Sequence, residues 1–286
     1  MLALIGMLVV AGSVIGGFLS EGGPIGILVQ PVEMLIIFGS ALGTLLISTP
    51  IHHIKSLVGG ILGMLKGGGP GKAGYQELLV LQYELFVNAR KHGFIALERD
   101  IAEPDKSSII SKYPKFLANH HAVTFLMDSL RLLVDGAVSP MDLDSLLDRE
   151  LETHHEEASK PAAALTKVGD TLPGLGIVAA VLGIIIAMGK IDGPAAEMGH
   201  AVAVALVGTF LGVLGAYGFV NPLAVGLESG TEGETNYFAC MKAGMVAFAK
   251  GSPPSVAIEF ARRVIYSSDR PTGAELETAI QGVTPR

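Results

Sequence analysis

The chain contains four apolar runs, each long enough to cross a lipid bilayer as a helix. They occupy residues 2–20, 32–50, 171–191 and 201–220, and they contain almost no charge. About 20 helical residues at a rise of about 1.5 Å span the roughly 30 Å hydrocarbon core of a bilayer. The sequence therefore predicts an all-α membrane protein with four transmembrane helices.

The last two runs also lack any group that could carry a proton. Neither residues 171–188 nor residues 201–220 contain Asp, Glu, Lys, Arg or His. A proton that crosses the membrane on a protein needs an ionisable side chain there that can bind and release it. If this protein moves ions, we expect the titrating group to come from another chain.

Composition excludes several other classes of protein. Only 16% of the 286 residues are charged, which is too few for a typical soluble domain. The net charge is −7 and no basic stripe is present, so nucleic-acid binding is disfavoured. The single cysteine, Cys240, excludes an intrachain disulfide and a multi-cysteine metal site. No cofactor and no bound metal are expected.

The distribution of Lys and Arg predicts which side of the membrane each segment faces. Residues 51–168 hold 13 of the 20 basic residues, whereas the loop EGGPIGILVQP holds none and the loop KIDGPAAEMG holds only Lys190. Basic residues remain on the cytoplasmic side of a membrane protein. The insert 51–168 and the tail 225–286 are therefore expected in the cytoplasm. The start, MLALIGMLVV, lacks a basic segment and is interpreted as a retained helix. Because the loop after it is expected outside, the N-terminus is expected in the cytoplasm too.

The resulting domain organisation has four parts, and its cytoplasmic parts are predicted to be helical. Residues 1–50 carry spans 1 and 2, residues 51–168 the insert, residues 169–224 spans 3 and 4, and residues 225–286 the tail. A helical stripe with a 3.6-residue period runs through Leu78, Leu81, Leu85 and Phe86.

Helix boundaries follow from capping residues. Gly93 is a plausible helix end, and Ser139-Pro140 is a good start for a helix that continues toward the third span. Two helices are expected in the tail, around 228–250 and 254–267. The segment GILGMLKGGGPGKAG is predicted to be a flexible joint after the second span.

Three other motifs are weak. GGGPGKA lacks the first glycine and the final Ser or Thr that a phosphate-binding loop requires. Adjacent histidines occur at 52–53, 120–121 and 154–155, but neighbouring side chains on a helix point about 100° apart, so surface or interfacial histidines are the favoured interpretation. No pattern of catalytic residues is recognisable, so an enzyme is not predicted.

Two prolines are the most informative residues in the membrane spans. Pro173 lies in the first turns of the third span and Pro222 at the end of the fourth, so both fall at one level near the cytoplasmic face. Each proline frees a backbone carbonyl four residues earlier, at Gly169 and Gly218. Simple helix termination is one interpretation, and a shared hinge near an ion exit is the other.

Three further residues lie in or beside these spans, and two of them have two interpretations each. The Thr209 hydroxyl either bonds back to the Ala205 carbonyl or faces an ion path. Asp170 is either a carboxylate at the inner mouth or a charge that stabilises a helix N-terminus. Tyr217 is interpreted as an interfacial anchor. Glycine pairs four apart, such as Gly208/Gly212, permit tight packing within this chain or against another.

The last two spans and part of the insert resemble a known family. VGDTLPGLGIVAAVLGIIIAMG and PAAEMGHAVAVALVGTFLGVLGAYGFVNPLA are similar to spans 3 and 4 of the MotA family of flagellar motor stator subunits, within the MotA/TolQ/ExbB proton channel superfamily. NARKHGFIALERDIAEP resembles the family's torque-generating segment. The resemblance covers nearly the whole chain, including span order and insert size.

The resemblance implies an assembly and a mechanism. Five such subunits surround two copies of a MotB-type partner, which is anchored to peptidoglycan and supplies an essential membrane aspartate. Protons bind and leave that aspartate as they cross the bacterial inner membrane. Each protonation change alters which subunit packs best against the partner helix, and the ring steps and turns the rotor through its switch-ring protein FliG.

The family's functional residues correspond to positions in this sequence. The two membrane prolines correspond to Pro173 and Pro222. The rotor-facing charges correspond to Arg90 and Glu98, with Glu150 as a third. From the residues alone, Arg90 reads as a charge that favours a helix C-terminus and Glu98 as part of a solvated face.

The resemblance also bears on the transported ion. Sodium-driven relatives carry a threonine in the third span and another in the fourth, and hydroxyls there help to replace sodium's hydration shell. Here the third-span position is Ala180, and only the fourth-span hydroxyl, Thr209, is present. Proton transport is therefore predicted.

Three alternatives stay open at this point. TolQ- and ExbB-like energisers of the same superfamily resemble three-span proteins, whereas this chain has four. A self-contained channel lacks intramembrane charge here, although hydroxyls and carbonyls can conduct. A membrane-bound enzyme has no recognisable constellation.

Overall fold

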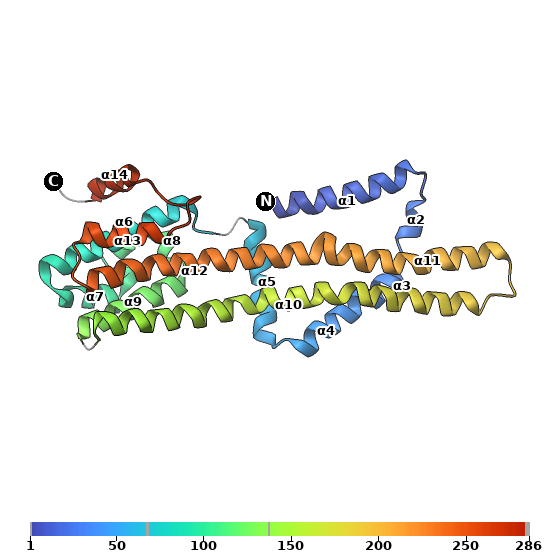
Figure 1. Ribbon diagram of the computed structural model, residues 1–286, viewed down its shortest axis with the longest axis horizontal. Coiled ribbons are helices and arrows are strands. Elements are labelled where there is room, and N and C mark those ends of the chain that lie inside the picture. Colours follow the sequence, from blue (N-terminus) through green and yellow to red (C-terminus); the bar gives the residue numbers. More distant parts are fainter. Residues whose placement is uncertain (1, 67–68, 137, 284–286) are drawn as a thin grey trace. The chain divides into compact units, whose positions relative to one another are not determined.

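The computed structural model describes residues 2–66, 69–136 and 138–283, and every regular element in these ranges is a helix (Figure 1). The all-α prediction is therefore confirmed. The chain divides into two compact units. The first combines Met1–Gly68 with Ala158–Gly230, and the second combines Gly69–Glu157 with Thr231–Arg286.

The first unit contains the membrane spans. Its complete helices are α1 (Leu2–Ser20), α2 (Ile25–Leu28), α3 (Pro31–Met34), the π-helix η1 (Leu35–Gly39), α4 (Ser40–Ser48), α5 (Ile51–Lys66), α11 (Ala195–Leu214) and the π-helix η5 (Gly215–Val220). It also includes the second part of α10 (Pro140–Met188) and the start of α12 (Asn221–Ala249).

Four helical stretches are long and apolar enough to cross a membrane, as predicted. They are Leu2–Ser20, Ile25–Ser48, Pro140–Met188 and Ala195–Ala249. The second is less regular than its sequence suggested, because it is interrupted at Val29 and Gln30 and then passes through η1. The third and fourth, of 49 and 55 residues, are much longer than the roughly 20 residues that a bilayer requires. The expected tail helix at 228–250 is thus an extension of the fourth span.

Helices α10 and α11 lie side by side because small residues line both faces of the contact (Figure 1). A Cβ placed on Gly176 would lie 2.8 Å from the Gly208 carbonyl oxygen, and one on Gly212 would lie 2.5 Å from the Leu172 carbonyl oxygen. Further along, a Cβ on Gly183 would lie 2.8 Å from the Ala205 Cβ. Gly208 and Gly212 therefore pack within this chain.

The second unit is a helical bundle with its own core. Its complete elements are α6 (Gly71–His92), α7 (Glu98–Ala102), α8 (Pro114–Leu117), α9 (His120–Asp135), α13 (Pro254–Val264) and α14 (Gly273–Val283), with 3₁₀ turns η2 (Phe94–Leu97), η3 (Pro104–Lys106) and η4 (Ile110–Lys112). The first part of α10 and the second part of α12 complete it. Helix α14 was not anticipated from the sequence.

The predicted stripe on α6 forms the centre of this core. Leu78, Leu81, Leu85 and Phe86 are fully buried. The Phe86 ring stacks on Phe248 of α12 with ring centroids 4.4 Å apart. A polar anchor lies beside them, because the buried Gln82 amide donates to the Met241 carbonyl at 2.9 Å. Aromatic stacking and this buried hydrogen bond both fix the register of α6 on α12.

Two predicted helix boundaries are confirmed, and the predicted joint is shorter than expected. Gly93 ends α6 with φ +83°, a conformation that favours glycine, and the Ser139 hydroxyl accepts from the Asp142 amide at the start of α10. Part of the expected flexible joint is helical, because residues 60–66 belong to α5 and residues 71–74 begin α6, whereas Gly69 and Pro70 between them are not helical. The central Gly67 and Gly68 of that segment lie outside the described residues.

Candidate functional site

Both membrane prolines lie inside continuous helices, so the interpretation as helix ends was wrong. Pro173 is in the interior of α10, as is Pro161. Pro222 follows the π-helix η5 directly, and the stretch Ala195–Ala249 is helical throughout. A proline cannot donate its backbone nitrogen and crowds the carbonyl four residues earlier. The wider π-helical turn before Pro222 is a local adjustment that accommodates such a residue.

The two prolines lie at the same level because their neighbouring residues pack together. A Cβ on Gly169 would overlap the side-chain amide of Asn221, so α10 and α12 touch at this point. The Asn221 Nδ2 donates to the Asp170 Oδ1 at 3.5 Å, and the Asn221 Oδ1 is buried with no partner among the described residues. Asp170 is thus an exposed mid-helix carboxylate, and its interpretation as a helix N-terminal charge was wrong.

The remaining predicted residues of the membrane path differ in exposure. The hydroxyls of Thr166 and Thr171 donate to carbonyls of their own helix, but in the described residues Thr209 makes no such bond to Ala205. Its predicted back-bond is therefore absent and its hydroxyl is available. Ala180 is buried against α11, with its backbone nitrogen 3.1 Å from a Cβ placed on Gly208. Tyr217 is exposed on η5, and its role as an interfacial anchor stays a prediction.

Sequence reasoning missed one residue in the second span. Glu33 on α3 is buried, and its Oε2 has no hydrogen-bond partner in the part of the chain that the structure describes. A single acid within a long apolar run was the available signal. A carboxyl group inside the membrane costs free energy, so such residues are rare and usually have a function.

Two of the charges assigned to the rotor surface flank one tight turn. Arg90 is exposed in the last turn of α6, and Glu98 is exposed in the first turn of α7. The turn between them consists of Gly93 and the 3₁₀ helix η2. Neither charge forms an ion pair among the described residues, although Glu103 pairs with Lys106 and Glu84 with Lys112 nearby. Both Arg90 and Glu98 are therefore free for a partner.

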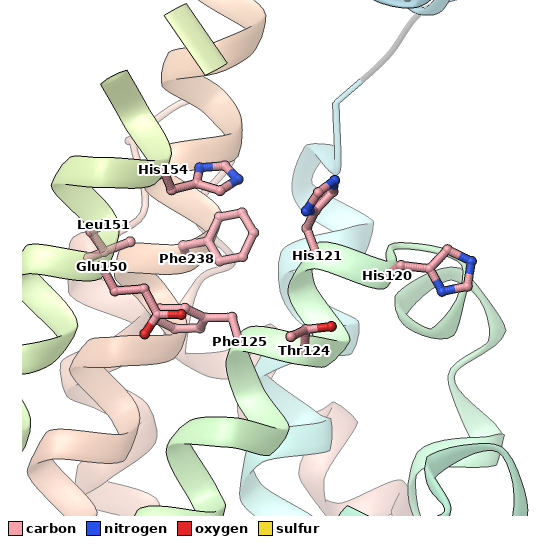
Figure 2. Close-up of a pocket in the computed structure, with 8 residues that line it drawn as sticks. All are labelled: His120, His121, Thr124, Phe125, Glu150, Leu151, His154 and Phe238. Carbon is pink, nitrogen blue, oxygen red and sulfur yellow. The ribbon is translucent and has the colours of Figure 1, made fainter. Parts of the chain in front are cut away.

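Glu150 lies in a different setting, at a pocket of about 290 Å³ formed by α9, α10 and α12. Figure 2 shows His154 of α10 over the Phe238 ring, with His121 and Thr124 of α9 on the other side. Partial burial raises the pKa of the Glu150 carboxyl, and the nearby Asp128 raises it further. No hydrogen bond or ion pair among the described residues joins Glu150 to Arg90 or Glu98.

His154 departs from the surface interpretation of the histidine pairs. Its ring centroid lies 4.5 Å from that of Phe238 and 6.0 Å from that of His121, and its Nδ1 is buried without a partner among the described residues. Burial lowers the pKa of His154, against an opposing effect of the Glu234 carboxylate. The described residues hold no cluster of three or more metal-ligating side chains. Because burial lowers its pKa, the His154 imidazole is favoured in its neutral form.

This arrangement predicts a pH-dependent stability of the second unit. The pKa of His154 is lowered from 6.5 in the folded protein, so the unfolded chain binds the extra proton more readily. Stability is then complete above about pH 6.5 and falls as the pH decreases below it.

We expect the melting temperature in detergent to fall less between pH 7.5 and 5.5 in His154→Leu than in the wild type. His120→Leu, which changes a histidine that points away from His154 in Figure 2, is the control. Equal pH dependence in wild type and His154→Leu would contradict the assignment.

Comparison with known families gives two matches along the chain. Residues 4–93 match the family described as Motility protein A N-terminal. Residues 118–239 match the MotA/TolQ/ExbB proton channel family. The first match includes Glu33 and Arg90, and the second includes both membrane prolines.

Individual relatives extend over almost the whole chain. Motility protein A of Escherichia coli (strain K12) is 42% identical over 283 residues, which cover 99% of this chain and 96% of the relative. The chemotaxis protein LafT of Vibrio parahaemolyticus is 37% identical and covers 96% of each chain. Among solved structures, the flagellar MotAB stator complex from Bacillus subtilis is similar with a TM-score of 0.72 and 26% identity, over 90% of this chain and 92% of that chain.

Proposed function

Because this chain belongs to the motility protein A family, a multi-pass inner-membrane family, we propose that it is a stator subunit that couples proton flow to torque on the flagellar rotor. The observation that carries the proposal is the match to a relative named Motility protein A along 99% of the chain. The separate N-terminal match over residues 4–93 and the four spans favour a stator over an energiser of the TolQ or ExbB type.

The ion-binding carboxylate on which rotation depends is proposed to come from a MotB-type partner. Spans 3 and 4 contain no acidic or basic residue between 171 and 188 or between 201 and 220. The similar structure from Bacillus subtilis is described as a MotAB complex. Several copies of this chain, five by resemblance to the family, surround the partner. Gly12 and Gly16 on α1 have no described atom within 4 Å of an added Cβ, so this face is open for a neighbouring helix.

The two prolines are proposed to convert protonation of the partner into a change of helix shape. Pro173 and Pro222 lie at one level, where Gly169 and Asp170 contact Asn221. When a carboxyl group in the membrane gains or loses its charge, the free energy of placing it in apolar surroundings changes by several kcal/mol. Helices that lack two backbone hydrogen bonds at one level bend there more easily than elsewhere.

Torque is proposed to pass to the rotor through the exposed charges of the second unit. Arg90 and Glu98 have opposite signs and no ion-pair partner among the described residues. Complementary charges on an exposed surface give steering and register with little affinity, which suits repeated brief contacts with a switch-ring protein such as FliG. This assignment places the second unit and both termini in the cytoplasm.

Proton rather than sodium transport is supported by the residues along the path. Ala180 offers no hydroxyl and is buried, and Thr209 supplies a single available hydroxyl. A sodium site needs several oxygen ligands to replace water. No cofactor is required for this function.

The test is rotation of tethered cells that lack their own stators. We expect rotation only when this chain is expressed with its cognate partner, in sodium-free buffer, and we expect a protonophore to stop it. Rotation without the partner would contradict the proposal that the partner supplies the ion-binding carboxylate. Rotation only after sodium is restored would keep the stator assignment and refute the proposal that the transported ion is a proton.

A further inference from the structure

Glu33 is the only Asp, Glu, Lys, Arg or His within residues 2–20, 25–48, 171–188 and 201–220. Its side chain is 6% exposed, and its Oε2 is buried without a hydrogen-bond partner in the described part of the chain. An unpaired carboxylate in the membrane interior costs about 3 kcal/mol or more, so such residues mark ion pathways or bind protons.

The carboxyl lies at the contact between spans 3 and 4. A Cβ placed on Gly208 would lie 3.2 Å from the Glu33 Oε2, 3.1 Å from the Ala179 Cβ and 3.1 Å from the Ala180 nitrogen. The missing side chain of Gly208 therefore makes the space that the carboxyl occupies. Ala180 is eight residues from Met188, the end of α10, so this point lies about 12 Å inside the outer end of that helix.

The backbone around Glu33 is irregular on both sides. Val29 and Gln30 are extended, and Pro31 begins α3 two residues before Glu33. The π-helix η1 follows two residues later, at Leu35. Non-helical backbone at membrane depth is tolerated only where it is covered by protein or faces water, and interrupted helices of this kind form ion sites in transporters. The break is thus a second, independent indication that this point of the span is not an ordinary lipid-facing helix.

We propose that Glu33 binds and releases the transported proton on the outer half of the path, one step before the partner's carboxylate. The inference rests on the proposed stator function. In each cycle the Glu33 O–H bond breaks as the proton passes to the partner's carboxylate, directly or through a water molecule. A hydronium ion from the external side then restores the O–H bond and leaves water. The membrane segments around Glu33 carry no other ionisable Asp, Glu, Lys, Arg or His that could take this role.

The test compares Glu33→Gln with wild type in stators assembled with the partner, at low and high load. Glutamine has nearly the same shape but cannot release a proton. We expect the low-load rotation speed to fall about tenfold, because proton delivery limits that speed. Torque near stall stays at the wild-type value, because there the ion step is close to equilibrium. Glu197→Gln, the same change at an exposed position in the first turn of α11, is the control and rotates at wild-type speed.

The other outcomes of this experiment either support or overturn the proposed role of Glu33. Equal low-load speeds for Glu33→Gln and wild type overturn the proposal, as does an equal loss at both loads, which indicates a structural role. If Glu33→Gln does not assemble, Glu33→Asp is used: a changed dependence of low-load speed on external pH supports the proposal, and an unchanged one overturns it. If the wild type itself does not rotate with its partner, the stator function fails instead.

Discussion

Gly212→Ala is expected to abolish motility by forcing spans 3 and 4 apart. The added Cβ would lie 2.5 Å from the Leu172 carbonyl oxygen and 2.9 Å from the Gly176 Cα. Both are backbone atoms, so no side-chain rotation relieves the clash. Overpacking of this kind costs about 1–3 kcal/mol, and a contact with backbone falls at the upper end of that range. The shift also moves Gly208 and the carboxyl of Glu33 that lies against it.

The measurement is thermal unfolding of the detergent-solubilised complex, together with swimming in cells without other stators. Gly199→Ala is the matched control, because it makes the same change on the same helix where no described atom lies within 4 Å. A Gly212→Ala protein that melts and swims like Gly199→Ala would show that the α10–α11 contact is not as close as described.

Arg90→Glu is expected to reduce rotation by about tenfold or more while the protein stays folded. The side chain is exposed and forms no ion pair among the described residues, so its role within the chain is limited to the helix end. Reversing a charge in the last turn of α6 costs about 0.3–1 kcal/mol of stability. Placing like charges together at an interface costs several kcal/mol, which is the larger effect.

The measurement is torque in tethered cells, with stator assembly checked by copurification of the partner. Lys91→Glu makes the same change one residue away and on a different side of the helix. Restored rotation after a matching charge reversal on the rotor would establish the contact. Unimpaired torque in Arg90→Glu, or an equal loss in Lys91→Glu, would remove Arg90 from the rotor surface.

Several features were predictable because they depend on local sequence. The four apolar runs, the helical stripe around Leu81, the helix end at Gly93 and the start at Ser139 follow from length, periodicity and capping. The resemblance to the family likewise used contiguous residues. The joint after the second span was predicted too long, because glycine content suggests flexibility while α5 continues through residues 60–66.

The sequence by itself determined that this chain is helical, that it crosses a membrane four times and which family it belongs to, because hydrophobic length and contiguous motifs are properties of the chain alone. Only the tertiary structure decided that Pro173 and Pro222 lie within continuous helices, that Thr209 keeps its hydroxyl available, and that Glu33 meets Gly208 and Ala180. These relations join residues up to 175 positions apart. Their distances depend on how small residues let separate helices approach, and no local pattern records that approach.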